Sequence, residues 1–409
     1  MDSLSILNYQ GSKRNLLPFI AENSAAAILP GQTVLDIFAG TCSVGYSFKR
    51  TNRIFANDAE EYAYLISKAL LGNYADVAVC NTTGNICLAF EKNFKEASKA
   101  YSGFISDEIA VLNKGVISEI DDFYQSVPTV WNGGIHKIIE SRHLFLQYYS
   151  NSYFGVTQAA EIDSLRIAIE GYRNTNLFAP LMASLYYAMK ECVFSKDGHM
   201  AQPLGLGKNI NKLLKTRQRS IFLLFQAKLL EFFSIDFATS PYENECFNMN
   251  FEDLLKMQKI EEEVDVIYAD PPYTDMQYSR YYHLLNFVAQ YKPTPLTMIR
   301  GLHTKGLYTE GRFQSKLSKR SQSIDAFAVL VDYCCAFNKN LVVSFAYPAD
   351  VALQKTDRYV MTIESLISLC AERFGASNVD VHSCDYTHSN NRNSEQKKVL
   401  EYLVVCKMD

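Results

Sequence analysis

The amino-acid sequence predicts an α/β protein in which a Rossmann-like, mostly parallel sheet carries an inserted, mainly helical domain. Toward both ends of the chain, apolar strand-like runs that end in polar or acidic residues alternate with helical patterns. Residues 75–240 lack this alternation and show mainly helical patterns, at 86–101, 105–125, 136–150, 160–171, 177–194 and 212–234. The chain has 409 residues, enough for two domains, which we place at residues 1–74 with 241–409 and at residues 75–240.

The strand predicted at residues 264–269 leads directly into Asp270, Pro271, Pro272 and Tyr273. The run is rich in β-branched and apolar residues, which is typical of a strand buried on both faces. The two prolines end the ladder hydrogen bonding and stiffen the backbone. Asp270 and Tyr273 therefore stand just beyond the carboxyl end of a strand, where open α/β sheets bind ligands.

This loop has the chemistry to hold an aromatic amine. The Asp270 carboxylate and the Pro271 carbonyl can only accept hydrogen bonds, and two acceptors side by side suit an amino group with two N–H bonds. Tyr273 offers a flat face on which a heteroaromatic ring can stack. The alternative interpretation is an ordinary strand-to-loop turn with a buried tyrosine.

A second strand-like run ends at Asp36 and is followed by the loop residues Phe38, Ala39 and Gly40. The loop lacks the G-x-G-x-x-G fingerprint and a P-loop lysine, so we do not expect it to cradle a pyrophosphate. Asp36 would suit a cationic amine, and Gly45 would let the following helix pack closely on the strand.

A third run, residues 53–57, ends in Asp58, about twenty residues after Asp36. In a nucleotide-binding βαβ unit an acid at this spacing holds the ribose hydroxyls, and it is equally compatible with a helix N-cap. An adenosine ligand without phosphates, combined with a cationic amine, indicates S-adenosyl-L-methionine as cofactor. Asn250 and Phe251, at the end of a further short strand, are candidates to contact its adenine.

Charge and cysteine usage exclude several classes of protein. The net charge of −4 gives no global basic field, so any nucleic-acid contact needs local basic segments. The 10 cysteines are scattered without a C-x-x-C pair, which favours reduced thiols in a cytoplasmic protein over disulfides or a zinc site. We expect no metal, no signal peptide and no membrane-spanning segment.

Two basic segments are candidates for contact with DNA phosphates. The first, at the tail of the helical insert, contains Lys208, Lys212, Lys215, Arg217 and Arg219. The second contains Lys305, Arg312, Lys316, Lys319 and Arg320. A solvated helix face is the alternative for the first segment, and a disordered surface loop is the alternative for the second. His283 has apolar neighbours, and we interpret it as structural.

Four segments occur in a fixed order along the chain: Tyr9-Gln10-Gly11-Ser12-Lys13, Asp36-Ile37-Phe38-Ala39-Gly40, Asn57-Asp58 and Asp270-Pro271-Pro272-Tyr273. In this order they resemble the Dam-like class of adenine-specific DNA methyltransferases, in the arrangement known as the α-group. The resemblance covers roughly residues 5–75 and 245–405. The insert lies where that family keeps its target-recognition domain.

The resemblance implies roles for the cofactor-side residues. Tyr9 and Lys13 would border the cofactor, although the family usually has Trp at the position of Tyr9. The loop from Asp36 to Gly40 would hold the methionine portion, and Asp58 the ribose hydroxyls. The family more often has Asp at the position of Asn250, which would contact the cofactor adenine.

The implied reaction is methyl transfer from S-adenosyl-L-methionine to the 6-amino group of an adenine flipped out of double-stranded DNA. Asp270, which also borders the cofactor, and the Pro271 carbonyl would bind the amino group, and Tyr273 would stack on the base. One alternative substrate is the 4-amino group of cytosine, although enzymes with that activity usually have Ser in place of the Asp. Another is an amine of RNA or protein. The chain could also be a DNA-binding protein that has lost catalysis. A restriction-modification or related host-protection role with a cognate restriction endonuclease is expected. The recognition sequence, and monomer or homodimer, stay open.

Overall fold

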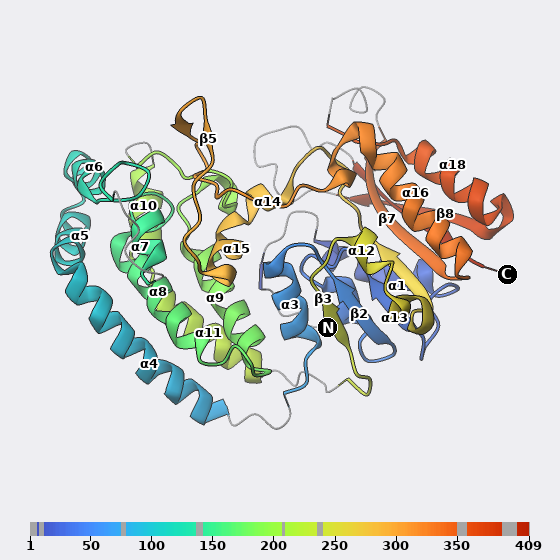
Figure 1. The fold of residues 1–409 in the computed structure, drawn as a ribbon, viewed down its shortest axis with the longest axis horizontal. Helices are drawn as coiled ribbons and strands as arrows, with labels where there is room; N and C mark the ends of the chain where they lie inside the picture. Colours follow the sequence, from blue (N-terminus) through green and yellow to red (C-terminus); the bar gives the residue numbers. More distant parts are fainter. Residues whose placement is uncertain are drawn as a thin grey trace. The chain divides into compact units, whose positions relative to one another are not determined.

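The computed structural model describes residues 6–7, 12–74, 79–135, 142–206, 209–234, 240–349, 358–386 and 399–408. The chain divides into two compact units (Figure 1). The sheet unit comprises residues 1–73, 238–277 and 313–409, and the helical unit comprises residues 74–237 and 278–312. Every helix in the described ranges is too short or too polar to cross a membrane.

The sheet unit is built on one 7-stranded sheet with the order β3-β2-β1-β4-β7-β9-β8. The strands β3, β2, β1, β4 and β7 run parallel, and the hairpin of β8 and β9 closes one edge by antiparallel pairing. The prediction of a mostly parallel α/β sheet is therefore confirmed. The bounds are β1 Thr33–Asp36, β2 Arg53–Asn57, β3 Glu245–Phe247, β4 Val266–Ala269, β7 Asn340–Pro348, β8 Val379–Tyr386 and β9 Val399–Cys406.

The centre of this sheet is also the point where its strand order reverses. From β1 the chain adds β2 and β3 on one side, whereas β4 and β7 lie on the other side. Every residue of β1 and β4 is buried, as their apolar sequences require when helices cover both faces. Ligands of doubly wound sheets bind at the carboxyl ends of the strands at such a switch point, which here means β1 and β4.

Helices and short helical turns complete the sheet unit. Phe327 and Leu330 of α16, and Leu366 and Cys370 of α18, belong to one apolar core with the central strands. The helix α18 begins where the Thr362 hydroxyl accepts a hydrogen bond from the backbone N–H of Ser365. The bounds are η1 Lys13–Leu16, α1 Leu17–Ser24, α2 Ser43–Phe48, α3 Glu61–Leu71, α12 Phe251–Leu254, α13 Gln258–Glu263, η4 Lys316–Ser318, α16 Arg320–Ala336, α18 Ile363–Phe374 and η5 Ala376–Asn378.

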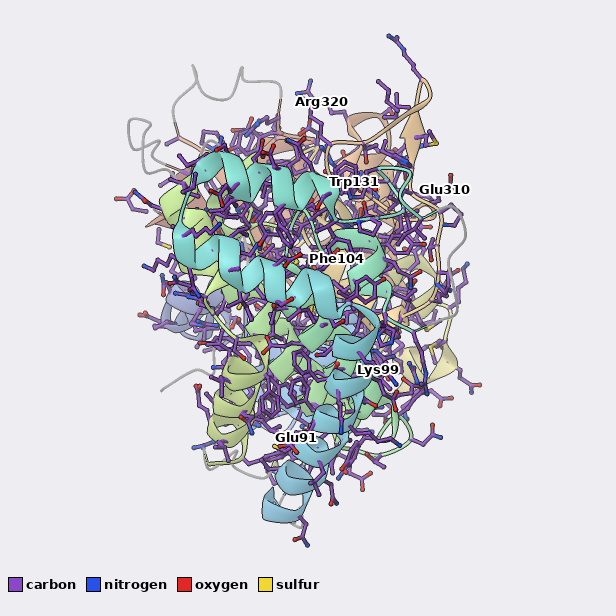
Figure 2. All side chains as sticks on the ribbon, turned by 90° about the vertical axis from the view of Figure 1, so that its left-hand side faces the viewer. Glu91, Lys99, Phe104, Trp131, Glu310 and Arg320 are labelled. Carbon is purple, nitrogen blue, oxygen red and sulfur yellow. The ribbon has the colours of Figure 1, made fainter. Side chains whose placement is uncertain are left out.

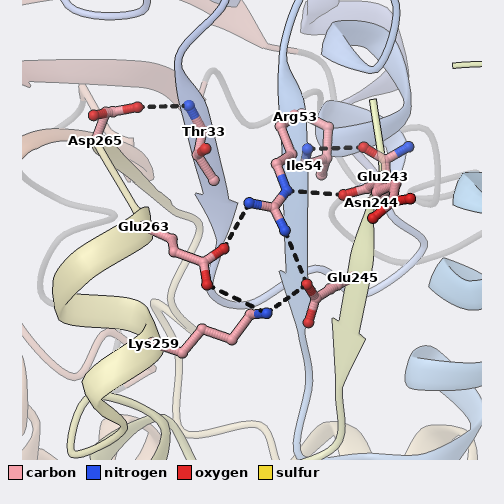
Figure 3. A network of polar contacts seen from close by, with 9 residues as sticks. All are labelled: Thr33, Arg53, Ile54, Glu243, Asn244, Glu245, Lys259, Glu263 and Asp265. Atoms are coloured by element: carbon pink, nitrogen blue, oxygen red, sulfur yellow. Dashed lines mark hydrogen bonds and ion pairs between the residues drawn. The ribbon is translucent and has the colours of Figure 1, made fainter. Parts of the chain in front are cut away.

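A polar network joins the amino ends of the strands (Figure 3). Arg53, the first residue of β2, pairs with Glu245 at the start of β3 and with Glu263 at the end of α13, at 2.9 and 2.6 Å. Lys259 contacts the same two carboxylates. This network fixes the edge of the sheet opposite to the carboxyl ends, so it is structural.

In the helical unit the other helices pack around α8 and α9, whose residues are largely buried. The long helix α4 is amphipathic, and its exposed face carries charged residues such as Glu91 and Lys99 (Figure 2). The bounds are α4 Val79–Ala100, α5 Ser102–Lys114, α6 Ile117–Ser126, α7 Leu144–Tyr149, α8 Val156–Glu170, α9 Phe178–Cys192, η2 Lys196–Gly198, α10 Ile210–Arg217, α11 Ile221–Ser234, α14 Tyr278–Tyr281, α15 His283–Gln290, β5 Met298–Ile299 and β6 Leu302–His303.

The helical unit also contains residues 278–312, which the sequence analysis grouped with the sheet. Phe287 of this segment packs against Phe145 and Tyr149, with ring centroids at 5.5 and 5.3 Å. The buried guanidinium of Arg166 donates hydrogen bonds to the carbonyls of Val288 and Ala289. The segment follows the Asp-Pro-Pro-Tyr strand in sequence, but the apolar side chains of its helix α15 are buried within the helical unit.

Candidate active site

Three aspartates mark the carboxyl edge of the sheet. Asp36 is the last residue of β1, Asp58 follows β2 and Asp270 follows β4, and these three strands are parallel neighbours. Burial, followed by the charges of Asp270 and Asp58, raises the pKa of Asp36 to about 7. Burial raises the pKa of Asp58 to about 6. Carboxyl groups gathered in a poorly solvated site favour a cationic partner.

The orientation of Asp58 is fixed by backbone donors. Its Oδ2 accepts a hydrogen bond from the N–H of Gly40, and its Oδ1 accepts one from the N–H of Glu60, both at 2.9 Å. Gly40 has φ +52°, a left-handed conformation that glycine adopts without strain. Each carboxylate oxygen has a further lone pair, so Asp58 can still accept hydrogen bonds from a ligand.

Asp36 lies against the start of α2. Its Oδ2 accepts a hydrogen bond from the N–H of Gly45 at 3.2 Å. A Cβ atom on Gly45 would lie 3.1 Å from Cys42 Sγ and from Ile54 Cγ2, and 3.4 Å from the Asp36 carboxylate. The prediction that Gly45 permits close packing of helix and strand is therefore confirmed.

Asn57 joins the loops that follow β1 and β3. Its Nδ2 donates hydrogen bonds to the carbonyls of Ile37 and Met249, both at 3.1 Å. Phe38 and Phe251 meet edge to face, with ring centroids 5.4 Å apart. Of the predicted cofactor residues, the structure thus brings together those on the loops after β1, β2 and β3, which are Phe38, Ala39, Gly40, Asp58, Asn250 and Phe251.

Lys13 lies beside the Asp-Pro-Pro-Tyr loop. Its side chain is 4% exposed, and its Nζ lies 3.1 Å from Asp270 Oδ1 and 2.8 Å from Glu401 Oε1. Burial by itself lowers the pKa of Lys13, but the two carboxylates outweigh this effect and hold the pKa well above its ordinary value. Burial raises the pKa of Asp270, and Lys13 partly offsets that rise. The ammonium group is therefore charged and shared between two acids.

Glu401 of β9 and Ser344 of β7 were not predicted as site residues. Both are completely buried, and the Ser344 hydroxyl donates a 2.5 Å hydrogen bond to Glu401 Oε1. The sequence does contain a signal for Glu401, because Val399, Glu401 and Leu403 alternate along one face of a strand that is otherwise apolar. An acid at such a position needs a buried partner.

The ring of Tyr273 is 7% exposed. It packs against Phe345 at 6.0 Å and lies nearly parallel to Tyr359, with centroids 6.5 Å apart and an interplanar angle of 22°. The Lys13 ammonium lies 5.8 Å from its centroid. The loop is thus anchored by its aromatic residue, and stacking of a base on Tyr273 stays a prediction.

The predicted DNA-contacting residues have different environments. Lys208 lies outside the described residues, and so does Tyr9, which was predicted to border the cofactor. Arg217 is only 6% exposed and donates hydrogen bonds to the carbonyls of Ser152 and Tyr153, which contradicts the predicted DNA contact. Exposed candidates are Lys212, Lys215, Lys305, Lys319 and Arg320, of which Lys212 donates a hydrogen bond to the carbonyl of Ser195 at 2.7 Å.

The other basic candidates have acidic or aromatic partners. Arg219 pairs with Glu191, and Lys316 pairs with Glu252. The guanidinium of Arg312 lies 4.4 Å from the centre of the Tyr308 ring. Their role in DNA binding stays a prediction.

His283 belongs to the interior of the helical unit. Its Nε2 lies 2.9 Å from the carbonyl oxygen of Met200. Burial lowers the pKa of this histidine to about 3. The neutral ring and its buried contacts support the structural interpretation. In the described part of the chain, no cluster of three or more His, Cys, Asp or Glu side chains could hold a metal.

Comparisons with known proteins identify one matching family model and several related methyltransferases. A family model for the D12 class N6 adenine-specific DNA methyltransferases matches residues 9–326. The chain is 25% identical to the modification methylase LlaI of Lactococcus lactis subsp. lactis, across 98% of this chain and 55% of LlaI. It is 25% identical to the type II methyltransferase M.FokI of Planomicrobium okeanokoites, across 70% of this chain and 37% of M.FokI.

A further relative matches along most of both chains. The type II methyltransferase M.NlaIII of Neisseria lactamica is 22% identical, across 97% of this chain and 98% of M.NlaIII. The chain thus spans about half the length of LlaI, about a third of M.FokI and nearly all of M.NlaIII.

Proposed function

Because this chain belongs to the D12 class N6 adenine-specific DNA methyltransferases, we propose that it methylates the 6-amino group of adenine at a specific site in double-stranded DNA. The observation that carries the proposal is the position of Asp270. Its carboxylate stands beyond the carboxyl end of β4, at the switch point of the sheet, beside the acidic edge formed with Asp36 and Asp58.

The residues at the carboxyl edge fit S-adenosyl-L-methionine. The acidic edge suits the positive charges of its amine and sulfonium groups, and Asp58 keeps lone pairs for the ribose hydroxyls. Asn250 and Phe251 border the same loops. When bound, this cofactor supplies a methyl group that is already activated by the positively charged sulfur.

Asp270 and the Pro271 carbonyl would bind the target amino group. The lone pair of an aromatic amine is delocalised into the ring, which makes the nitrogen a poor nucleophile. Two acceptors that hold its two hydrogens draw the nitrogen toward a tetrahedral shape and expose the lone pair. Lys13 occupies Asp270 Oδ1, which leaves Oδ2 for the amine. The negative charge of Asp270 also stabilises positive charge that develops on the nitrogen.

Duplex DNA would be the partner, and the adenine must leave the helix to reach this loop. The names of LlaI, M.FokI and M.NlaIII as modification or type II methyltransferases support a restriction-modification role with a cognate endonuclease. The site of action would be the cytoplasm, where the cellular DNA lies. An orphan regulatory methylase is the alternative biological role, and it would show the same chemistry.

The test is methylation of duplex DNA by the purified protein with S-adenosyl-L-methionine, followed by mass spectrometry of the released nucleosides. We expect N6-methyladenine from the wild type. The variant Asp270→Ala should lose at least about 10²–10³-fold in rate, because a directed acceptor at the reacting nitrogen is removed. The thermal midpoint of the variant reports whether the fold survives.

Other products would overturn the proposal in distinct ways. N4-methylcytosine would identify the other amino-group substrate, and label found only in added RNA would identify an RNA methyltransferase. Bound cofactor without transfer to any nucleic acid would indicate a decayed enzyme. Near-normal turnover by Asp270→Ala would refute the role of the carboxylate.

A further inference from the structure

We propose that Glu401 is a positioning residue for this reaction, which holds the Lys13 ammonium away from full pairing with Asp270. The inference rests on the proposed function of the Asp-Pro-Pro-Tyr loop and adds a residue that none of the four sequence motifs contains. Asp270 would thereby keep a net negative charge and a free oxygen for the target amino group.

The geometry of the three charged groups carries this inference. Lys13 Nζ lies closer to Glu401, at 2.8 Å, than to Asp270, at 3.1 Å. One cation is thus shared by two carboxylates, so the group has a net charge of −1 when all three are ionised. A lysine paired with Asp270 alone would neutralise the carboxylate, which would then attract the developing positive charge of the amine less strongly.

Glu401 is held in place by a hydrogen bond from Ser344 in addition to its ion pair with Lys13. Its side chain is fully buried, and its Oε2 has no hydrogen-bond partner among the described residues. An ionised carboxylate in such a place is costly unless it is paired. Ser344, on the neighbouring strand β7, donates to the Oε1 that also binds Lys13, and so fixes the direction of that oxygen.

Charged and titratable groups face Asp270 from several elements. They determine the direction in which the pKa of Asp270 should move when the Glu401 charge is removed. Those groups are Lys13 of η1, Glu401 of β9, Asp36 of β1 and Tyr268 of β4, while Tyr273 of the loop itself faces Lys13. The Glu401 charge raises the pKa of Asp270, whereas Lys13 lowers it. Removal of the Glu401 charge should therefore make Asp270 easier to ionise, yet weaker as an electrostatic partner for the amine.

The decisive variant is Glu401→Gln, which keeps the size of the side chain and removes its charge. We expect kcat at pH 8 to fall about tenfold, less than for loss of a group that touches the reacting atoms. We also expect the loss of activity in acid to move to lower pH. A merely structural role would lower stability and leave kcat of the folded enzyme at pH 8 unchanged, because the shift of the acid limb by itself needs only the loss of a nearby charge.

The control is Glu263→Gln, which removes a carboxylate of the same unit from the network at the opposite edge of the sheet. It should leave both kcat and the acid limb unchanged. Glu401→Asp keeps the charge but withdraws it from Lys13, so its acid limb should lie between those of the wild type and Glu401→Gln. This variant keeps the proposal testable if the glutamine variant does not fold.

A second readout does not depend on methyl transfer. In protein labelled with carboxyl-¹³C aspartate, Asp270→Asn identifies the resonance of Asp270 by its disappearance. The titration midpoint of this resonance should move to lower pH in Glu401→Gln and remain in place in Glu263→Gln. An unmoved midpoint together with an unmoved acid limb would overturn the role of Glu401. Failure of the wild type to methylate adenine would instead overturn the proposed function and leave this titration interpretable.

Discussion

At the scale of single residues, burial of acids at the carboxyl edge of the sheet lowers the stability of the folded protein when they are ionised. Asp36 is 2% exposed, and it has other carboxylates rather than a cation as its charged neighbours. Its raised pKa means that the folded protein disfavours the ionised form. Such a residue is best explained by a cationic ligand that binds at this edge of the sheet.

This explanation predicts a stability gain from Asp36→Asn that grows with pH. Below pH 3.8 Asp36 is protonated in both folded and unfolded protein, so it imposes no ionisation penalty. The penalty builds up as pH rises from 3.8 to about 7 and is complete above that value. At pH 8 the variant should gain on the order of 2–4 kcal/mol in unfolding free energy, as measured by urea denaturation.

The same variant should bind S-adenosyl-L-methionine roughly tenfold more weakly, or about 1.4 kcal/mol, in isothermal titration calorimetry. The control Asp253→Asn removes an exposed aspartate that pairs with Lys256, and both its stability and its affinity should match the wild type. A variant at Asp36 that is less stable at pH 8 than at pH 5, relative to wild type, would contradict this electrostatic account.

At the scale of elements, the sequence predicts the strands and the loops that directly follow them, but not contacts between distant segments. The strands that end at Asp36, Asn57 and Ala269 were predictable because buried β-branched runs and loop residues adjoin in the chain. The contact between Lys13 and Glu401 was not, because 388 residues separate them and only tertiary packing brings η1 beside β9. The predicted helix 105–125 is likewise interrupted at Gly115, whose φ of +69° ends α5.

The helical unit contains a buried cap that the sequence did not reveal. Glu108 of α5 is 2% exposed and accepts hydrogen bonds from the N–H groups of Val156 and Thr157, at the start of α8. It also accepts one from the Tyr124 hydroxyl. A carboxylate at this position satisfies backbone donors that a helix start leaves free.

Gly155→Ala should therefore destabilise the protein. A Cβ atom there would lie 2.2 Å from Glu108 Oε1 and 2.9 Å from Arg217 Cδ, so the cap would have to move. We expect a loss of about 1–3 kcal/mol in unfolding free energy, measured by chemical denaturation. Gly171→Ala is the matched control, since its nearest contact would be an ordinary 3.6 Å. Equal stabilities of the two variants would refute the proposed packing constraint.

At the scale of the whole molecule, the assignment of residues to the two units is only partly predictable. The alternation of strand and helix patterns distinguishes the sheet from the inserted helices, but the assignment of residues 278–312 depends on tertiary burial that no local pattern encodes. With a net charge of −4, DNA binding must come from restricted basic surfaces. In the sheet unit, Lys316, Lys319 and Arg320 form the beginning of α16 and the turn before it.

Replacement of these three residues by Ala should weaken binding to all DNA sequences alike. It should also reduce the slope of log affinity against log salt concentration by about 2–3, because each lost phosphate contact removes about 0.9. Fluorescence anisotropy at several salt concentrations measures this slope. The control removes the same charge from the exposed residues Lys92, Lys95 and Lys99 of α4. An unchanged slope in the first variant would place the DNA on another surface.

The loop of Asp270, as proposed above, presents a target adenine to an activated methyl group. The most direct test is single-molecule sequencing of modified bases in DNA from cells that express the protein, in parallel with cells that express Asp270→Ala. We predict methylated adenine at one short sequence motif in the first DNA and none at that motif in the second. The absence of modified adenine from the first DNA, with folded protein that binds S-adenosyl-L-methionine, would contradict the claim.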